Sequence, residues 1–196
     1  MDSKDRVKIW NTFLKFARDS ASALKQYESS SWQDPGYSWD TPKAGGTLVE
    51  KDMLKLSLLS WCILAAQARS SHLIQECKEE NFIDDNQAES FSQLNFKQQW
   101  LILPVIKMKP HVKSLIDFKQ YPHRVIKELH KLRDNLFHVN HDKLKKQLDN
   151  IKSDELLDYF VNFIEAMENM NVLLERGGLK KARPEVLGIA DAFRKQ

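Results

Sequence analysis

Residues 56–68, LSLLSWCILAAQA, form the longest stretch of the chain without a charged side chain and decide its fold class. At thirteen residues the stretch is too short to span a bilayer, since a membrane-spanning helix takes about 20 apolar residues. Apolar residues begin at Met53 and fall on most sides of a helix, which is typical of a helix buried by its neighbours. We therefore predict the central helix of an all-α bundle, capped by Thr47 and running to about Glu80.

Helical patterns continue on both sides of this central helix. A first helix is expected from about Asp5 to Glu28, because apolar residues recur there at three- and four-residue spacing. Downstream, we expect a polar connection at 84–88, a helix at 91–108 that Pro104 ends or kinks, and a short turn or helix at 110–119. A helix from Pro122 to about Val139 and a short segment at 142–151 follow. The last of these elements is a long helix that Ser153 caps and Gly177-Gly178 stops.

No strand pattern or repeat interrupts this series, so the predicted fold class is all-α, a helical bundle of about five to seven helices. One domain is expected over residues 1–196, with its core at about 48–176. An irregular loop is expected at 29–47 and a basic tail at 179–196, where a last helix fits 184–195. The loop contains three aromatic residues that either pack against the body, the commoner case, or form a lid or a partner contact: Trp32, Tyr37 and Trp39.

Cysteine usage and the start of the chain indicate a cytoplasmic protein. Cys62 and Cys77 have no metal-ligand spacing, so we expect two reduced, buried thiols. The first ten residues are charged from the start and lack the apolar core of a signal peptide. The sequence therefore predicts a cytoplasmic location and no membrane partner.

Positive charge is concentrated in one quarter of the chain. Residues 101–150 contain eleven Lys or Arg and five Asp or Glu, and so carry +6 in a chain whose net charge is +3. The same quarter holds five of the six histidines. A one-sided basic stretch attracts phosphates, but most such stretches are solvated helix faces. Charge alone therefore leaves both interpretations open.

The helix expected at 122–139 carries the candidate chemistry near its end. On a helical wheel at about 100° per residue, five apolar residues point within about 40° of one direction. They are Val125, Leu129, Leu132, Leu136 and Val139. Arg133 and Asn135 lie about 80° to either side of that direction, and His138 lies about 140° away from it. These polar residues therefore border the buried stripe, where packing orients them toward a groove.

Arg133 and His138 combine two groups that suit chemistry on a phosphate. A guanidinium is a planar, permanently charged donor that stabilises the extra negative charge of a five-coordinate phosphorus. An imidazole titrates near neutral pH and moves a proton on or off a ribose hydroxyl or a leaving oxygen. No metal is required when the ribose 2′-hydroxyl is the nucleophile. An Arg and a His five residues apart also occur by chance in many helices, so the pair alone is not specific.

The string RDNLFH at 133–138 resembles the motif of the HEPN superfamily (higher eukaryotes and prokaryotes nucleotide-binding), in which Arg, a polar residue and three further residues precede His. Asp134 fits the polar position. The preceding LHKL at 129–132 and the place of the motif late in a helical bundle are similar too. More weakly, LNFKQQW at 94–100 resembles a polar-aromatic-Lys stretch that opens a middle helix in several such proteins. The resemblance covers these six motif residues and, loosely, the bundle at 48–176.

This resemblance implies a metal-independent endoribonuclease, because many HEPN proteins have that activity in toxin–antitoxin, CRISPR-associated and other antiviral systems. Arg133 would bind and stabilise the scissile phosphate, and His138 would act as general acid or base. Asp134 and Asn135 would orient them or touch RNA. The resemblance further implies single-stranded RNA as substrate, a 2′,3′-cyclic phosphate product, no cofactor, and a homodimer in which each subunit supplies its Arg–His pair to one composite site. Further candidates for RNA binding are Lys127, Lys131, His141 and Lys143.

One departure concerns regulation. HEPN toxins paired with a nucleotidyltransferase antitoxin usually carry Tyr two residues after the His, where this chain has Asn140. An antitoxin or other regulatory protein is still an expected partner, but that particular pairing is in doubt. Two alternatives remain for function. One is a non-catalytic HEPN-like module that binds a nucleotide, RNA or a protein partner, and the other is a scaffold whose basic stretch only contacts RNA phosphates.

A zinc site is the competing interpretation of the same region. His130, Asp134, His138 and His141 follow each other at four-, four- and three-residue spacing, which suits metal ligands on one side of a helix. No Glu general base lies between them and no second ligand cluster is present. We therefore favour exposed histidines and predict no metal.

Overall fold

The structure, a computed structural model, describes residues 3–29, 50–107, 116–137 and 141–176, and these contain seven α-helices and no strand. In chain order they are α1 (Ser3–Ser29), α2 (Glu50–Glu79), α3 (Asp85–Ser92), α4 (Phe96–Lys107), α5 (Arg124–Phe137), α6 (His141–Asn150) and α7 (Ser153–Arg176). The predicted all-α bundle of five to seven helices is confirmed. None of the described helices combines the length and the apolar character that crossing a membrane requires.

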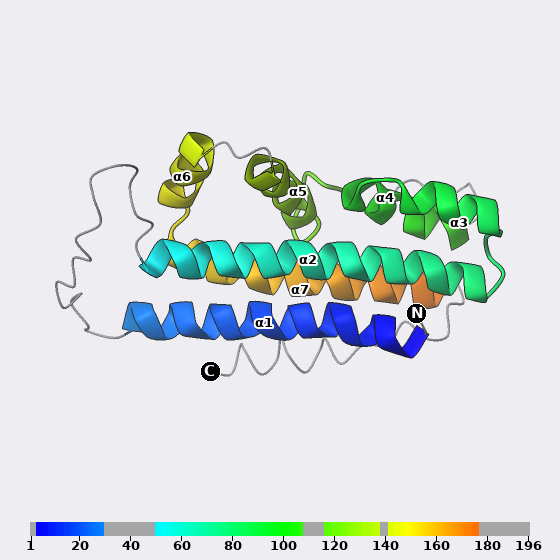
Figure 1. Cartoon of the computed structure of the whole chain (residues 1–196), viewed down its shortest axis with the longest axis horizontal. Helices are drawn as coiled ribbons and strands as arrows, with labels where there is room; N and C mark the ends of the chain where they lie inside the picture. The colour runs from blue at the N-terminus through cyan, green and yellow to red at the C-terminus, as the bar shows by residue number, and fades with distance from the viewer. Residues whose placement is uncertain (1–2, 30–49, 108–115, 138–140, 177–196) are drawn as a thin grey trace.

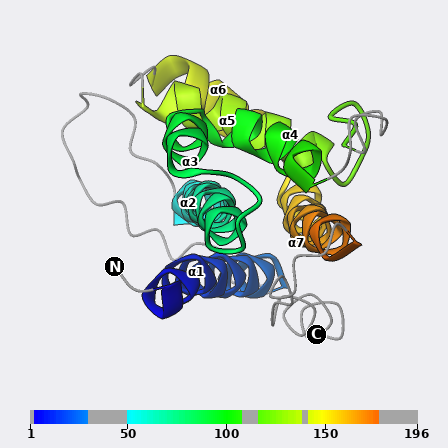
Figure 2. The same cartoon turned by 90° about the vertical axis from the view of Figure 1, so that its right-hand side faces the viewer.

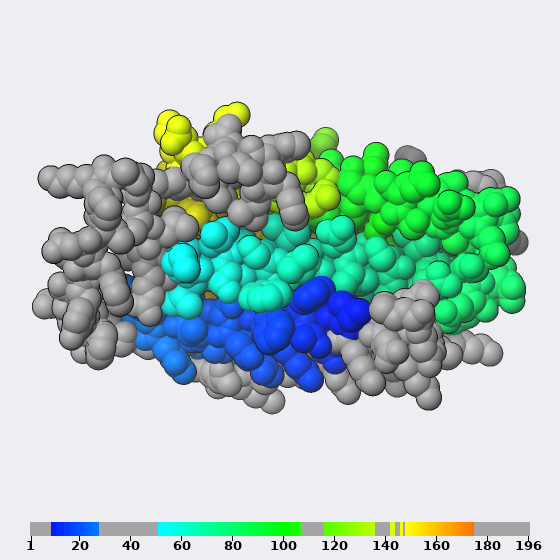
Figure 3. Space-filling model, in the orientation of Figure 1, coloured from blue at the N-terminus to red at the C-terminus, as the bar shows by residue number. Residues whose placement is uncertain are grey.

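The three long helices α1, α2 and α7 run side by side along the length of the molecule (Figure 1). The end-on view in Figure 2 shows the shorter helices α3 to α6 as a second layer on the side away from α1. Helix α2 contacts each of the other six described helices, which confirms its predicted place at the centre. On the face shown in Figure 3, α1 and α2 lie against each other along their length.

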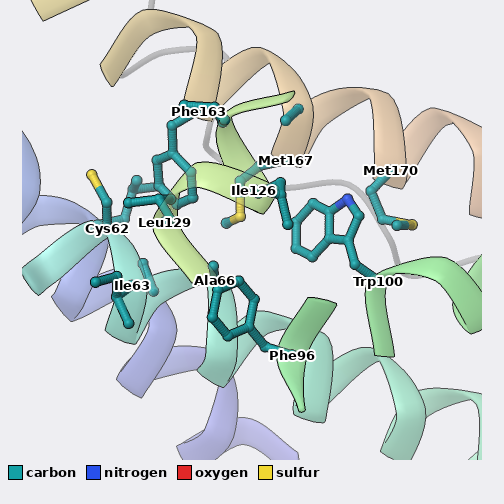
Figure 4. Packing of buried hydrophobic residues seen from close by; sticks show 14 of the residues in the cluster. Cys62, Ile63, Ala66, Phe96, Trp100, Ile126, Leu129, Phe163, Met167 and Met170 are labelled. Carbon is teal, nitrogen blue, oxygen red and sulfur yellow. The ribbon is translucent and has the colours of Figure 1, made fainter. Parts of the chain in front are cut away.

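The core includes a row of buried α1 residues against α2 and a second part where α2, α4, α5 and α7 meet. Figure 4 shows the rings of Phe96 and Trp100 from α4 directed toward Ile126 of α5 and Met167 of α7. The largest fully buried side chains include Trp100, Phe96, Phe160 and Phe163. Full burial of such a side chain stabilises the fold by about 1.5–3 kcal/mol. This apolar contact fixes the position of α5, the helix that carries the motif.

Both cysteines are free thiols inside this core, as the sequence predicted. Burial raises the pKa of the Cys62 thiol because the charged thiolate loses its hydration. Neither thiol is therefore placed to react with solutes in the folded protein.

The sequence prediction is wrong between the central helix and Trp100, where two capping boxes create two helices. Asp84 is not part of a connection but the N-cap of α3: its carboxylate accepts the Gln87 N–H at 2.8 Å, and the Gln87 side chain accepts the Asp84 N–H at 3.0 Å. Asn95 and Gln98 make the same exchange at 3.0 and 3.1 Å before α4. These reciprocal bonds satisfy amide groups that a helix start leaves open, so the helix predicted at 91–108 divides into α3 and α4.

Two smaller predictions about helix ends also need correction, and a third is narrowed. Pro104 was predicted to end or kink its helix, and it does not end it, because α4 continues to Lys107. Pro122 lies in the turn before α5 rather than in its first turn, and its carbonyl accepts the Val125 N–H at 3.3 Å. Ser153 is the first residue of α7, and its buried hydroxyl has no hydrogen-bond partner in the described part of the chain, so it is not the predicted cap.

Several predictions fall on residues outside the described ranges. They concern the cap at Thr47, the loop and its aromatic residues, the start of the segment at 110–119, the helix end at Val139, the Gly177-Gly178 stop and the basic tail.

A buried lysine fastens α6 to α2. The Lys55 Nζ donates to the carbonyls of Leu148, at 3.1 Å, and Ile151, at 2.8 Å, and lies 3.8 Å from the Asp52 carboxylate. An ammonium at the carboxyl end of a helix is favourable, because the last carbonyls have no partner within the helix and carry partial negative charge. This contact holds the segment that follows the motif against the start of α2.

Candidate functional site

Helix α5 presents the described part of the buried face that the helical wheel predicted, because Val125, Leu129 and Leu132 are buried. Ile126, which the wheel did not place on that face, is buried too. The side chains of Leu136 and Phe137 lie outside the described residues, as does His138. The catalytic assignment of His138 therefore stays a prediction, and the geometry of the site rests on Arg133, Asp134 and Asn135.

Asp134 lies between a histidine and the candidate catalytic arginine. Its Oδ2 is 3.2 Å from the His130 Nδ1, and its Oδ1 is 3.9 Å from the Arg133 Nη1. The His130 ring packs against Phe96, with 5.3 Å between ring centroids. Arg133 and Asn135 are half-buried at the edge of the helix, next to the core stripe. Asp134 thus lies within ion-pair distance of both His130 and Arg133, while its predicted role, to orient the catalytic groups or touch RNA, stays a prediction.

A basic cavity opens on the exposed side of α5. It has a volume of about 400 Å³ and is lined by Phe118, Lys119, Arg124, Lys127, Glu128 and Lys131. Two of the predicted RNA-binding residues, Lys127 and Lys131, thus share one site. The single carboxylate, Glu128, accepts a hydrogen bond from the Arg124 Nε at 2.7 Å. Four cations against one anion give the cavity a positive field that suits a phosphate.

The other two RNA-binding candidates are not brought into this cavity. Lys143 is exposed on α6 and does not line it. His141 is the first residue of α6, and its side chain lies outside the described residues. Conversely, Lys119 and Arg124 were missed as individual candidates. Lys127 and Lys131 follow Arg124 by three and seven residues, and this spacing could have indicated that the three cations share one side of the helix.

A second cavity, of about 420 Å³, adjoins the first and shares Glu128 and Lys131 with it. Its other lining residues are Tyr121, Leu132, Asn150, Ile151, Glu155 and Tyr159. The Tyr159 hydroxyl donates to the Val125 carbonyl at 3.2 Å, and burial, assisted by Glu128, raises the pKa of Tyr159. Sequence reasoning could not find this site, because its walls come from α5, from α7 and from the residues between α6 and α7.

A buried polar cluster on α2 was also missed. The Arg69 guanidinium donates to the Asn171 side chain at 2.7 Å and lies 4.7 Å from the centroid of the Trp10 ring. The His72 Nε2 is 2.9 Å from the Glu76 carboxylate. Burial lowers the pKa of Arg69 to about 10, and Glu76 opposes that shift. The cluster ties α1, α2 and α7 together, and three polar residues on one side of an otherwise apolar helix were its signal.

The structure describes two of the four residues of the zinc interpretation, and the His130 side chain, predicted to be exposed, is only 18% exposed because it packs against Phe96. His130 and Asp134 form the pair described above, while His138 and the side chain of His141 lie outside the described residues. Within the described part of the chain, no group of three His, Cys, Asp or Glu side chains is arranged to hold a metal ion.

Comparison of the chain with family models, with curated proteins and with solved structures gave no match. The class is therefore defined by the fold and the site themselves. In the described residues the chain is an all-α bundle in which α5 carries the ion pairs of Asp134 with His130 and Arg133 and, separately, a basic cavity on its exposed side.

His123, at the base of α5, makes the stability of the fold depend on pH. The ring is buried, and burial lowers its pKa below the usual value of 6.5. Below pH 6.5 the unfolded chain binds a proton that the folded chain does not, so stability is full above that pH and falls as the pH drops through the folded pKa. The slope from this group is at most about 1.4 kcal/mol per pH unit.

Urea denaturation at a series of pH values between 4 and 8 measures this dependence. We expect His123→Gln to reduce the loss of stability on acidification relative to the parent. Identical slopes for the two proteins would show that His123 is not the group responsible.

Proposed function

We propose that the chain is a metal-independent endoribonuclease of the HEPN type that cuts single-stranded RNA. The observation that supports the proposal is that one helix, α5, carries the motif residues Arg133 and Asp134 and also the basic cavity with Lys127 and Lys131, which the motif residues do not line. A protein that binds a nucleic-acid backbone needs clustered cations, and cleavage needs a charged donor beside the scissile phosphate. The sequence resemblance of 133–138 supplies the reaction type.

In the proposed reaction the ribose 2′-oxygen attacks the adjacent phosphorus. The new bond from the 2′-oxygen to phosphorus forms as the bond to the 5′-oxygen of the next nucleotide breaks. The His138 imidazole of one subunit takes the 2′-hydroxyl proton, and the protonated His138 imidazole of the second subunit gives a proton to the leaving 5′-oxygen. Arg133, oriented by Asp134 at 3.9 Å, stabilises the charge on the five-coordinate phosphorus. The products carry a 2′,3′-cyclic phosphate and a 5′-hydroxyl.

The proposal includes a homodimer. In an ideal helix the directions of Arg133 and His138 differ by about 140°, so a single helix does not direct both groups at one phosphate. Two subunits related by a two-fold axis would each contribute an Arg–His pair to a composite site. A defence or toxin–antitoxin role, with an antitoxin or another regulatory protein as partner, belongs to the same proposal.

The second candidate is a non-catalytic module that binds RNA or a nucleotide. The cavity with Lys119, Lys127 and Lys131 favours it, because cations alone hold a phosphate without turnover. In that case the protein binds RNA with strong salt dependence and leaves it intact.

The test is incubation of the purified chain with end-labelled single-stranded RNA, with and without EDTA. We expect equal cleavage in both, products that end in a 2′,3′-cyclic phosphate, and no cut where a 2′-deoxynucleotide replaces the nucleophile. His138→Ala should lower the rate by at least about a hundredfold, whereas the exposed Lys15→Ala on α1 should not. Loss of activity in EDTA, or cleavage at the deoxynucleotide, would contradict the proposal.

A further inference from the structure

The two adjoining cavities on α5, together named the groove, have chemically different linings. They meet at Glu128 and Lys131, which line both. One end carries the cations Lys119, Arg124 and Lys127, while the other carries tyrosines, carboxylates and an amide. The volumes of about 400 and 420 Å³ each lie in the range of small-molecule sites. A ligand that matches both ends is anionic at one end and, at the other, flat and rich in N–H donors.

Tyr121 offers the flat surface at the second end. Its side chain is 50% exposed, and the Arg124 guanidinium lies 5.4 Å from its ring centroid. This cation–π contact holds the ring in place beside the groove. Tyr159 belongs to the inner wall, because its hydroxyl is bonded to the Val125 carbonyl. Nucleic-acid bases stack readily on such aromatic rings.

Two carboxylates, Glu128 and Glu155, line the same cavity as Tyr121. Burial, followed by Glu128 and then Glu155, raises the pKa of Tyr121, while Arg124 lowers it. Glu128 is engaged by the Arg124 Nε at 2.7 Å, whereas Glu155 is exposed on the first turn of α7. An ionised carboxylate accepts two parallel N–H donors. Among the RNA bases, guanine presents two adjacent N–H donors on its Watson–Crick edge, and uracil presents one between two carbonyls.

We propose that this groove binds a guanine nucleotide, with the base on Tyr121, its N–H edge on Glu155 and its phosphate at Lys119 and Lys127. The inference rests on the proposed function, since it names the base that the ribonuclease recognises in a bound RNA; the phosphate at Lys119 and Lys127 is a neighbouring one and not the phosphate assigned to Arg133, which lines neither cavity. Lys131 lies where the two cavities meet and therefore lines the path between base and phosphate.

Binding of guanosine 3′-monophosphate and uridine 3′-monophosphate to the full chain, measured by titration calorimetry, tests the proposal without requiring cleavage. We expect the guanine nucleotide to bind about tenfold more tightly. Glu155→Gln should remove that preference, whereas Asp158→Asn, which removes the same charge one turn further along α7, should keep it. Circular dichroism of both variants shows whether the helices remain folded.

Two further variants probe the other contacts. Tyr121→Ala should weaken both nucleotides about tenfold by removing the stacking surface. Lys119→Ala should also weaken both and lower the salt dependence of binding, while Lys15→Ala on α1 serves as the matched control. Equal affinity for the two nucleotides, or a preference that survives Glu155→Gln, would overturn the guanine assignment.

Failure of this inference is separate from failure of the proposed function. RNA cleavage that depends on Arg133 but shows no guanine preference leaves the ribonuclease standing and removes the guanine site. Selective guanosine binding that depends on Glu155, in a chain that never cuts RNA, leaves the guanine site standing and removes the ribonuclease.

Discussion

Arg133→Ala is expected to lower the rate of RNA cleavage by about 10²- to 10³-fold, the usual cost of removing one donor to a developing negative charge. Arg133→Lys should recover only a small part of the rate, because an ammonium lacks the planar fork that grips two phosphate oxygens. The measurement is single-turnover cleavage of end-labelled RNA. Arg18→Ala, an exposed change on α1 that also removes a guanidinium, is the matched control and should cut RNA at the parent rate.

A mixture of two inactive variants tests whether the site is shared between subunits. Arg133→Ala and His138→Ala chains, unfolded and refolded together, should form mixed dimers that retain one Arg and one His, and part of the activity should return. Each variant refolded alone should stay inactive. An Arg133→Ala protein as active as the Arg18→Ala control would show that the motif is not the active site.

Arg69→Ala is expected to destabilise the fold by about 3–5 kcal/mol, a large part of the roughly 5–15 kcal/mol that holds a typical domain together. The change removes a buried guanidinium that donates to Asn171 and packs on the Trp10 ring. It also removes the positive charge that interacts with the buried Glu76 carboxylate. The stability of Arg69→Lys should lie between those of the parent and Arg69→Ala, because lysine keeps the positive charge but lacks the planar guanidinium with its paired N–H donors. Urea denaturation followed by circular dichroism measures these differences.

The control for Arg69 is again Arg18→Ala. Arg18 pairs with Asp19 at 2.8 Å, but the two side chains are 40% and 61% exposed, so the pair contributes only about 0–1 kcal/mol. If Arg69→Ala and Arg18→Ala unfold at the same urea concentration, the buried cluster does not stabilise the bundle as inferred.

The fold could be predicted where apolar spacing alone decides an element. Residues 56–68 required burial on most sides, and α2 does contact every other described helix. The prediction failed where a side chain bonds to a nearby backbone amide, as Asp84 and Asn95 do. The spacing of apolar residues does not distinguish these two residues from other polar positions. Their partners Gln87 and Gln98, each three residues further on, identify them once capping is considered.

The candidate site divides in the same way. The positions of Lys127 and Lys131 on one side of a helix follow from local spacing, and the structure places both in one cavity. Tyr159 and Glu155 reach the same helix from α7, and no local pattern contains that contact. The buried position of Arg69 likewise depends on Asn171, which is 102 residues away in the sequence. Tertiary contacts of this kind cannot be predicted from the pattern of any single segment.

The Lys55 contact also has a consequence for the order in which a nascent chain matures. Its acceptors, the carbonyls of Leu148 and Ile151, leave the ribosome 93 and 96 residues after the lysine. Until they emerge, a buried ammonium has no acceptor there and stays hydrated, so the start of α2 cannot close over it. The segment that follows the motif is therefore secured only when most of the polypeptide has been translated.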